Sequence, residues 1–402
     1  MKTFLDPTIS LQKVMGDQIY AALNGPIMEY LRQESNAGVD DDRAKEFQEY
    51  NNIMIEKKTF PELYRICLQA KQAVGFEQDI NFYATSNPSI NACSIAANNP
   101  QKQPHVVELN SGLVQLMSEK ELLFVVGHEI GHLINGDSQL KKLRNFIYKE
   151  EDEVPDFITS RLNLYRLLSE LSADRYGYIA CGGDEETAIT TEYKISSGID
   201  ISKMHVQLQA LIEENKKHLD YFLKSDKFIG DTHPVHPIRV YCLHLYATCK
   251  TQKQLDKAMA KIEDRFYQLS EEDATFNFFF VAAGWLLGNT DGEITDVQYQ
   301  QILNMVGKRC WFPKEFVQKV LDEHDLEQLY HHSIKLLVEH DEDNKVLMLD
   351  YLLSIAFIDG AFTENKLHFI YRYGHEVGLE DEEIAACISE LIPRHFSINV
   401  KI

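Results

Sequence analysis

The chain has 402 residues, of which 44% are hydrophobic and 25% are charged, a balance typical of globular proteins that bury a sizeable core. This length is enough for about two or three domains. The formal net charge of -22 argues against nucleic acid and against anionic membrane surfaces as partners, because both need basic patches. Solubility is a sufficient explanation of the acidity, so we infer no basic substrate from it.

The cysteine pattern and the absence of long apolar segments predict a soluble, cytoplasmic protein. Seven cysteines are spread along the chain without a CxxC pair, which favours reduced and mostly buried thiols. The first 20 residues contain no apolar core long enough for a secretory signal. No stretch approaches about 18 uninterrupted apolar residues, so we expect no transmembrane helix. The longest apolar stretch, residues 276–287, is predicted to be a buried helix.

The first third of the chain changes from helical to β-rich. Residues 1–75 are predicted to be a polar helical segment that packs over the next domain, with a loop at residues 36–44. Residues 80–109 contain short β-rich runs between Asn, Pro and Gln turns, which predict a small sheet of about three strands. An edge strand beside a cleft can bind an extended peptide by main-chain pairing. The alternative is that these strands only complete the core.

Residues 118–136, SEKELLFVVGHEIGHLING, are predicted to form the central helix of the chain. Ser118 and Glu121 match a capping box at its start. Asn135 and Gly136 supply a left-handed exit at its end. Apolar residues cover most of the helix surface, which predicts that the helix is buried.

Three polar side chains, His128, Glu129 and His132, interrupt this apolar helix in an HExxH pattern. Histidines four residues apart lie one above the other on a helix face, so their ring nitrogens can take two corners of a zinc tetrahedron. Glu129, one step round the helix, can face a water molecule at the metal. Such a short string also arises by chance. However, an unpaired buried polar group costs about 1–3 kcal/mol, so the apolar context favours a metal site.

A second helix with paired carboxylates is predicted for residues 158–180, after a charged and solvated segment at residues 141–155. Glu170 and Asp174 lie four residues apart on one face. A catalytic zinc with two histidines needs a third protein ligand, and Glu170 is our candidate. Asp174 is suited to accept the free ring N–H of a zinc-bound histidine. The alternative is two surface carboxylates, which the surrounding Leu and Ala residues disfavour, because paired buried carboxylates without a cation are costly.

The string HEIGH followed by ELSADRYG resembles the HExxH…ExxxD pattern of HtpX-like and CAAX-prenyl-protease-like zinc metallopeptidases, peptidase family forty-eight. The likeness covers roughly residues 75–245. It implies a zincin-type catalytic domain in which the downstream glutamate, here Glu170, is the third zinc ligand. Many relatives are embedded in membranes, whereas the connecting segments of this chain are polar. We therefore expect a soluble enzyme rather than one that acts on membrane substrates.

The family also has a THP motif followed by an arginine, and residues 231–240, DTHPVHPIRV, match it. The resemblance implies that His233 lies near the metal, where it either stabilises an oxyanion or binds zinc as a fourth ligand and closes the site. A loop made rigid by proline can present such an imidazole at a fixed angle. Arg239 is predicted to make a structural ion pair behind the ligands. His236 is predicted to be a solvated loop histidine.

The C-terminal part contains an internal repeat. Residues 285–303 and 353–371 both read as an apolar helix, Asp-Gly, two residues, a threonine and another helix. Thr295 and Thr363 are predicted to cap the second helices. A calcium loop fits poorly, because carboxylates are missing at its first and last ligand positions. The repeat resembles TerB-like (tellurite-resistance) helical domains, which implies an all-helical binding or regulatory module.

Together these features predict an α+β, mostly α protein: a zincin-like metallopeptidase domain with a small sheet, then an all-helical C-terminal domain. We predict a zinc endopeptidase with one Zn²⁺ ion, a peptide or protein substrate and a role in protein quality control or stress. The alternative is a latent or non-catalytic binding protein with an occluded zinc, whose helical module recruits a protein partner. The predicted boundaries are 1–75, 76–250, 251–272 for a helical connector, and 273–402.

Overall fold

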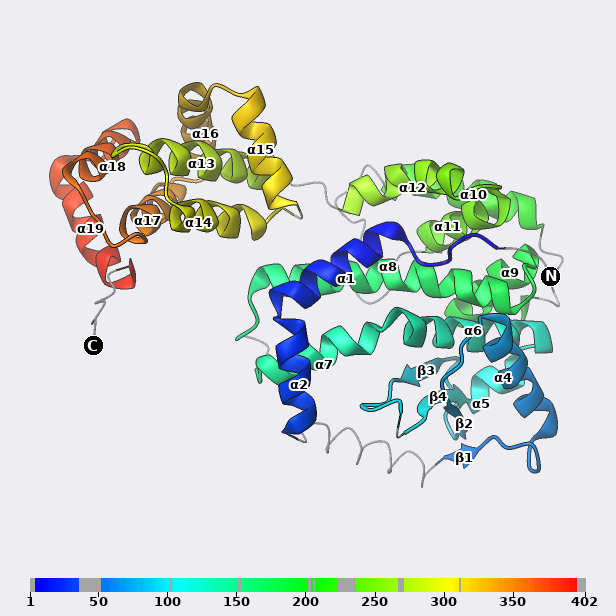
Figure 1. Cartoon of the computed structure of the whole chain (residues 1–402). Coiled ribbons are helices and arrows are strands. Elements are labelled where there is room, and N and C mark those ends of the chain that lie inside the picture. Colours follow the sequence, from blue (N-terminus) through cyan, green and yellow to red (C-terminus); the bar gives the residue numbers. More distant parts are fainter. Residues whose placement is uncertain are drawn as a thin grey trace. The chain divides into compact units, whose positions relative to one another are not determined.

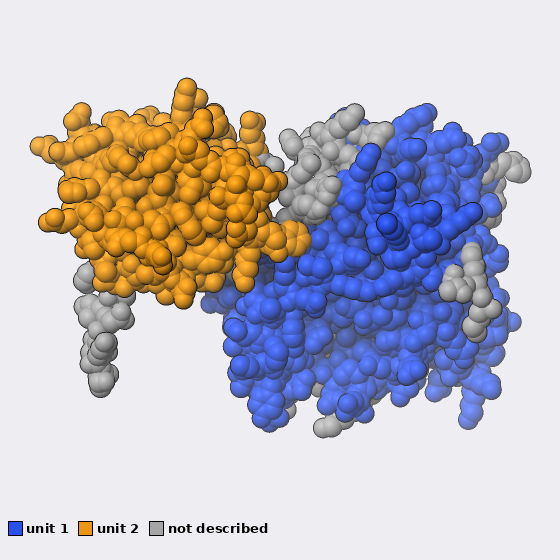
Figure 2. All heavy atoms as spheres, turned by 45° about the horizontal axis from the view of Figure 1, so that its top comes forward, with its two compact units in different colours: residues 1–266 blue, residues 267–402 orange. Residues whose placement is uncertain are grey.

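The computed structural model describes residues 4–35, 52–101, 103–150, 153–201, 204, 207–222, 236–266, 271–310 and 312–395. It is mostly helical with one small mixed sheet (Figure 1), which confirms the predicted fold class. The chain divides into two compact units, residues 1–266 and residues 267–402 (Figure 2).

Unit 1 contains the sheet and the helices that carry the predicted site, and the elements found in the described residues of unit 2 are all helices. The elements of unit 1 are α1 (Ser10–Ala22), α2 (Gly25–Glu34), β1 (Ile53–Met54), α4 (Pro61–Ala73), β2 (Ile80–Thr85), β3 (Ala92–Ile95), β4 (His105–Asn110), α5 (Ser111–Leu116), α6 (Glu119–Asn135), α7 (Asp137–Ile147), α8 (Asp156–Ala180), α9 (Glu185–Ser197), α10 (Leu208–Phe222), α11 (His236–Thr248) and α12 (Gln252–Phe266). Those of unit 2 are α13 (Glu271–Gly288), α14 (Asp296–Gly307), α15 (Pro313–Glu323), α16 (Leu326–His340), α17 (Asn344–Phe357), α18 (Glu364–Glu376) and α19 (Asp381–His395).

The sheet has the strand order β1-β2-β4-β3, with β3 at one edge. Strands β2 and β4 pair in parallel, and β3 pairs antiparallel with β4, so that Cys93 lies opposite Glu108. The three strands predicted within residues 80–109 are thus confirmed. Strand β1 was not predicted, because only two residues pair there and they follow a segment that reads as helical.

Helix α6 begins and ends where its sequence predicts. The carboxylate of Glu121 accepts a hydrogen bond from the Ser118 N–H at 2.7 Å, and Gly136 ends the helix with φ 71°. Glu121 also forms an ion pair with the buried Lys194 of α9 at 2.9 Å. The start of the helix is therefore fixed by both a local cap and a long-range contact.

Helix α6 lies between the sheet and α8, and small residues let the two helices approach closely (Figure 1). A Cβ atom on Gly127 would lie 2.3 Å from the Cβ of Ala180, and one on Gly177 would lie 2.8 Å from the Phe124 ring. Larger side chains at these positions would push the helices apart. This packing brings the polar residues of α6 next to those of α8.

The structure corrects two predictions around the site. Residues 141–147 do not form a solvated connection, because they belong to α7, where Leu143 is buried. His236 is not a loop histidine, because it begins α11 and its ring stacks on Tyr193 at 5.8 Å. The loop predicted at residues 36–44 lies outside the described residues.

The N-terminal segment packs within unit 1. The Ile9 N–H donates to the Ser172 hydroxyl of α8 at 3.0 Å, and the Tyr246 hydroxyl of α11 donates to the Leu5 carbonyl at 2.6 Å. Helix α12, predicted as part of a connector, also lies in unit 1. No helix within the described ranges has both the length and the apolar character needed to cross a bilayer.

Unit 2 has its own core, and the internal repeat corresponds to the helix pairs α13–α14 and α17–α18. Thr295 and Thr363 are the N-caps of α14 and α18, as predicted, and each side chain accepts a backbone N–H three residues later. Residues 276–287 form part of the buried helix α13. The resemblance to TerB-like domains and the protein partner remain predictions.

Candidate metal centre

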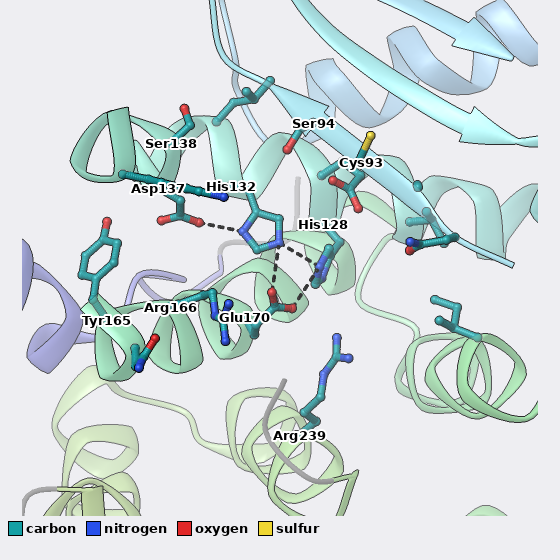
Figure 3. Close-up of a pocket in the computed structure, with 18 of the residues that line it drawn as sticks. Cys93, Ser94, His128, His132, Asp137, Ser138, Tyr165, Arg166, Glu170 and Arg239 are labelled. Carbon is teal, nitrogen blue, oxygen red and sulfur yellow. Dashed lines mark hydrogen bonds and ion pairs between the residues drawn. The ribbon is translucent and has the colours of Figure 1, made fainter. Parts of the chain in front are cut away.

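Helix α6 places His128 and His132 one turn apart on the face that looks toward α8. Their ring centroids are 4.7 Å apart, and their Nε2 atoms approach to 3.0 Å. From α8, Glu170 points at the same place (Figure 3). Its carboxylate oxygens lie 3.6 Å from Nε2 of His128 and 3.8 Å from Nε2 of His132. The three predicted ligands are therefore brought together.

The other nitrogen of each ring faces a carboxylate. Nδ1 of His128 lies 3.0 Å from Asp174, and Nδ1 of His132 lies 2.6 Å from Asp137. Each carboxylate accepts the Nδ1–H, so the hydrogen-bond network places the free lone pair on Nε2. Two such lone pairs 3.0 Å apart repel unless a cation or a proton lies between them.

The separations among these three side chains fit a zinc ion. With ligand bonds of about 2.0–2.1 Å, neighbouring corners of a tetrahedron lie about 3.3 Å apart. The observed separations of 3.0, 3.6 and 3.8 Å bracket that value. Two imidazoles and one carboxylate are also the donor set of a catalytic zinc site, which keeps one position for water or substrate.

The electrostatics of the two histidines also favour a cation. Burial lowers the pKa of His132, but the hydrogen bond to Asp137 and the charge of Glu170 outweigh it and raise that pKa to about 10. For His128, burial likewise lowers the pKa, but the hydrogen bond to Asp174 and the charges of Asp174 and Glu170 together raise it above its usual value. The surrounding carboxylates thus produce a negative potential at the place where the Nε2 atoms meet.

A second group of possible ligands, Asp174 and Glu192 beside His128, already has a cation. The guanidinium of Arg239 donates to Asp174 from Nε at 2.9 Å and to Glu192 from Nη2 at 2.9 Å. Burial raises the pKa of Glu192 to about 8 despite this arginine, whereas Arg239 and His128 overcome the effect of burial and hold the pKa of Asp174 well below its usual range. Arg239 therefore makes buried ion pairs behind His128.

Glu129 is also buried, with 8% of its surface exposed, and it lines the same cavity as the two histidines. The cavity has a volume of about 720 Å³ and is bounded on one side by Ala92, Cys93 and Ser94 of the edge strand β3. Figure 3 shows Cys93 and Ser94 on the strand side of His132. The same cavity is thus lined by the predicted general base, the predicted metal ligands and an edge strand.

His233, the predicted oxyanion donor or fourth ligand, lies outside the described residues. The alternative of an occluded zinc depends on that histidine.

Two residues of the centre, Asp137 and Glu192, were not predicted from the sequence. Asp137 follows the left-handed Gly136 directly, so its position just after the HEIGH helix was a usable signal. Glu192 had no local signal, because its role depends on contact with Arg239, 47 residues away in sequence.

Two comparisons with known proteins find likenesses to peptidases. The family model of peptidase family M48 matches residues 57–148, a range that holds His128, Glu129 and His132. Both this match and a distant relative support peptidase family M48. The relative, plastoglobule-localized metallopeptidase 48, chloroplastic, from Arabidopsis thaliana, is 20% identical over 247 residues, which cover 58% of this chain and 67% of the relative. No solved structure matches the chain.

Proposed function

We propose that this protein is a zinc-dependent endopeptidase whose ligands are His128, His132 and Glu170. The observation that carries the proposal is that the Nε2 atoms of the two histidines lie 3.0 Å apart and face Glu170. Each ring is held in this orientation by a hydrogen bond from its Nδ1 to a carboxylate. When bound, zinc supplies Lewis acidity and lowers the pKa of water toward about 7.

The chain's own residues supply the proton transfers and the positioning. The carboxylate of Glu129 takes a proton from the attacking water and later gives it to the leaving amine nitrogen. Asp174 and Asp137 hold the two imidazoles in one tautomer and orientation. Arg239, which also pairs with Glu192, in turn holds Asp174, which is 1% exposed, in a buried network. The edge strand β3 offers main-chain groups to an extended peptide along the cavity wall.

The deciding experiment separates metal binding from proton transfer. Glu129→Gln is expected to keep its zinc and to lose about 100-fold or more in kcat/KM on casein-derived peptides, because only the base is removed. Glu170→Ala is expected to lose zinc, because a ligand is removed. Zinc content is measured by elemental analysis of purified protein, and cleavage by mass spectrometry.

The matched control is Glu119→Gln on the same helix. The side chain of Glu119 is 53% exposed and pairs with Arg65, so its loss should leave both zinc and cleavage unchanged. Unaltered peptidase activity in Glu129→Gln would remove the proposed base, and full zinc content in Glu170→Ala would remove the proposed third ligand.

A further inference from the structure

The cavity that holds the metal centre continues between helices α7 and α8, and its charge changes sign along the way. Lys141 and Arg144 line it from α7, and Arg166 lines it from α8. Asp137 and Glu170 end the acidic part of the cavity at the metal centre. Beyond them, every charged side chain among the described lining residues of α7 and α8 is basic.

The helix geometry sets the distance between the metal centre and the basic side chains of the cavity. Asp137, which contacts His132, begins α7, and Lys141 and Arg144 follow it by four and seven residues. At a rise of about 1.5 Å per residue, these cations are displaced along the helix axis by about 6 and 10 Å. Arg166 precedes Glu170 by four residues on α8, again about 6 Å along the axis.

The cluster of Lys141, Arg144 and Arg166 differs in charge from the chain as a whole and in position from the neighbouring Lys142. The protein has 62 acidic and 40 basic residues, so three basic side chains along one stretch of cavity wall run against its overall charge. The adjacent Lys142 does not line the cavity, and its Nζ donates instead to the Ala96 carbonyl at 2.8 Å and to Asn98 at 2.9 Å. A cleft lined by one sign of charge concentrates ligands of the opposite sign.

We propose that Lys141, Arg144 and Arg166 form a carboxylate-binding subsite that selects peptides for cleavage. An extended peptide advances about 3.3 Å per residue, so a displacement of about 6–10 Å places the bound carboxylate two or three residues from the scissile bond. The carboxylate belongs either to an Asp or Glu side chain or to the C-terminus of the substrate. The inference rests on the proposed peptidase function and adds the class of substrate to it.

Paired peptides test the subsite. Fluorogenic peptides carry Glu or the uncharged Gln at one position, moved through the three residues on each side of the cleaved bond. A further pair ends in a free carboxylate or in an amide. We expect the acidic member to have a kcat/KM about tenfold higher at a position two or three residues from the bond, and the preference to weaken as salt screens the charges. Which pair shows the preference identifies the source of the carboxylate.

Substitutions assign the preference to the subsite. Arg166→Gln and Lys141→Gln are each expected to reduce the ratio of the two kcat/KM values by about threefold, and the double variant to bring it close to one. Lys58→Gln removes the same charge from an exposed position that does not line the cavity and should leave the ratio unchanged. Circular dichroism and zinc content confirm that each variant is folded and loaded.

A binding measurement keeps this test independent of catalysis. The dissociation constants of the same peptides, labelled, are measured by fluorescence anisotropy on zinc-loaded Glu129→Gln, with and without the two subsite substitutions. Tighter binding of the acidic peptide that disappears with Lys141→Gln and Arg166→Gln supports the subsite, even if no peptide is cut and the proposed function fails. Equal kcat/KM values and equal dissociation constants within every peptide pair would overturn the subsite. If both peptides of such a pair are cleaved, the proposed peptidase function still holds.

Discussion

The two ring nitrogens of each histidine at the candidate metal centre have different roles. Nε2 faces the shared site, and Nδ1 donates to a carboxylate, Asp174 for His128 and Asp137 for His132. The two carboxylates differ in the groups that hold them in place. Asp174 is buried against Arg239, whereas Asp137 lies at the start of α7 and also accepts a hydrogen bond from the hydroxyl of Ser169. The orientation of His132 therefore depends on a junction between two helices.

Asp137→Asn tests that dependence. The amide can still accept the Nδ1–H of His132, but it lacks the charge that makes the imidazole a stronger ligand. We expect zinc affinity to fall by about tenfold, the lower end of the range for such outer partners. Affinity is measured by competition with a chromophoric chelator. Asp322→Asn, an exposed change in unit 2, is the control, and equal affinities in the two variants would contradict the role given to Asp137.

At the scale of residues, helix periodicity predicted which side chains of the centre share a face within one helix, but not which faces of different helices meet. The spacing of His128 and His132, and of Glu170 and Asp174, placed each pair on one face. Nothing local could show that these two faces meet, which depends on the close approach at Gly127 and Gly177. The contribution of Glu192 could not be predicted for the same reason, because it is set by packing between α9 and α11.

At the scale of elements, the two repeats of unit 2 are joined through their Asp-Gly turns. Asp291 of the first turn accepts hydrogen bonds from Thr363 and Asn365 at the start of α18. Asp359 of the second turn accepts one from Gln298 of α14 at 3.0 Å. The turn sequences predicted caps and a tight connection, but the sequence did not show that each turn contacts the other repeat.

Lys366 is the cation at the centre of the second turn, and its removal should weaken unit 2. Lys366 is 2% exposed, and its ammonium contacts both oxygens of Asp359, at 2.8 and 2.9 Å, and the Ala361 carbonyl at 2.6 Å. Lys366→Met leaves that carboxylate without its cation, so we expect a loss of about 2–3 kcal/mol in the free energy of unfolding.

Both tryptophans of the chain, Trp285 and Trp311, fall within the sequence range 267–402, so we follow this unit by fluorescence during urea unfolding. Lys335→Met is the matched control, because its side chain is 71% exposed and its ion pair with Glu339 spans 3.9 Å. It should change stability by less than about 0.5 kcal/mol. A loss of that small size in Lys366→Met would show that the buried ammonium is not needed to hold the turn.

At the scale of the whole molecule, all described residues of the metal centre belong to unit 1, and unit 2 has a separate core. The sequence predicted a helical connector at residues 251–272 between a catalytic domain and a helical domain. The position of the division, after Phe266, was not predictable, because α12 is polar enough to read as a connector although Leu255 and Met259 are buried.

Removal of the metal should therefore destabilise one unit and spare the other. A ligand that binds only the folded state stabilises it by about 4 kcal/mol at a thousandfold excess over its dissociation constant. For a unit of this size that corresponds to roughly 10 °C in melting temperature. We expect a chelator to lower a transition in far-UV circular dichroism by about that much and to leave the tryptophan-fluorescence transition in place, because Trp285 and Trp311 lie outside unit 1. Equal shifts of both signals would mean that the units unfold together. No shift in either would mean that the metal contributes nothing to holding α6 against α8.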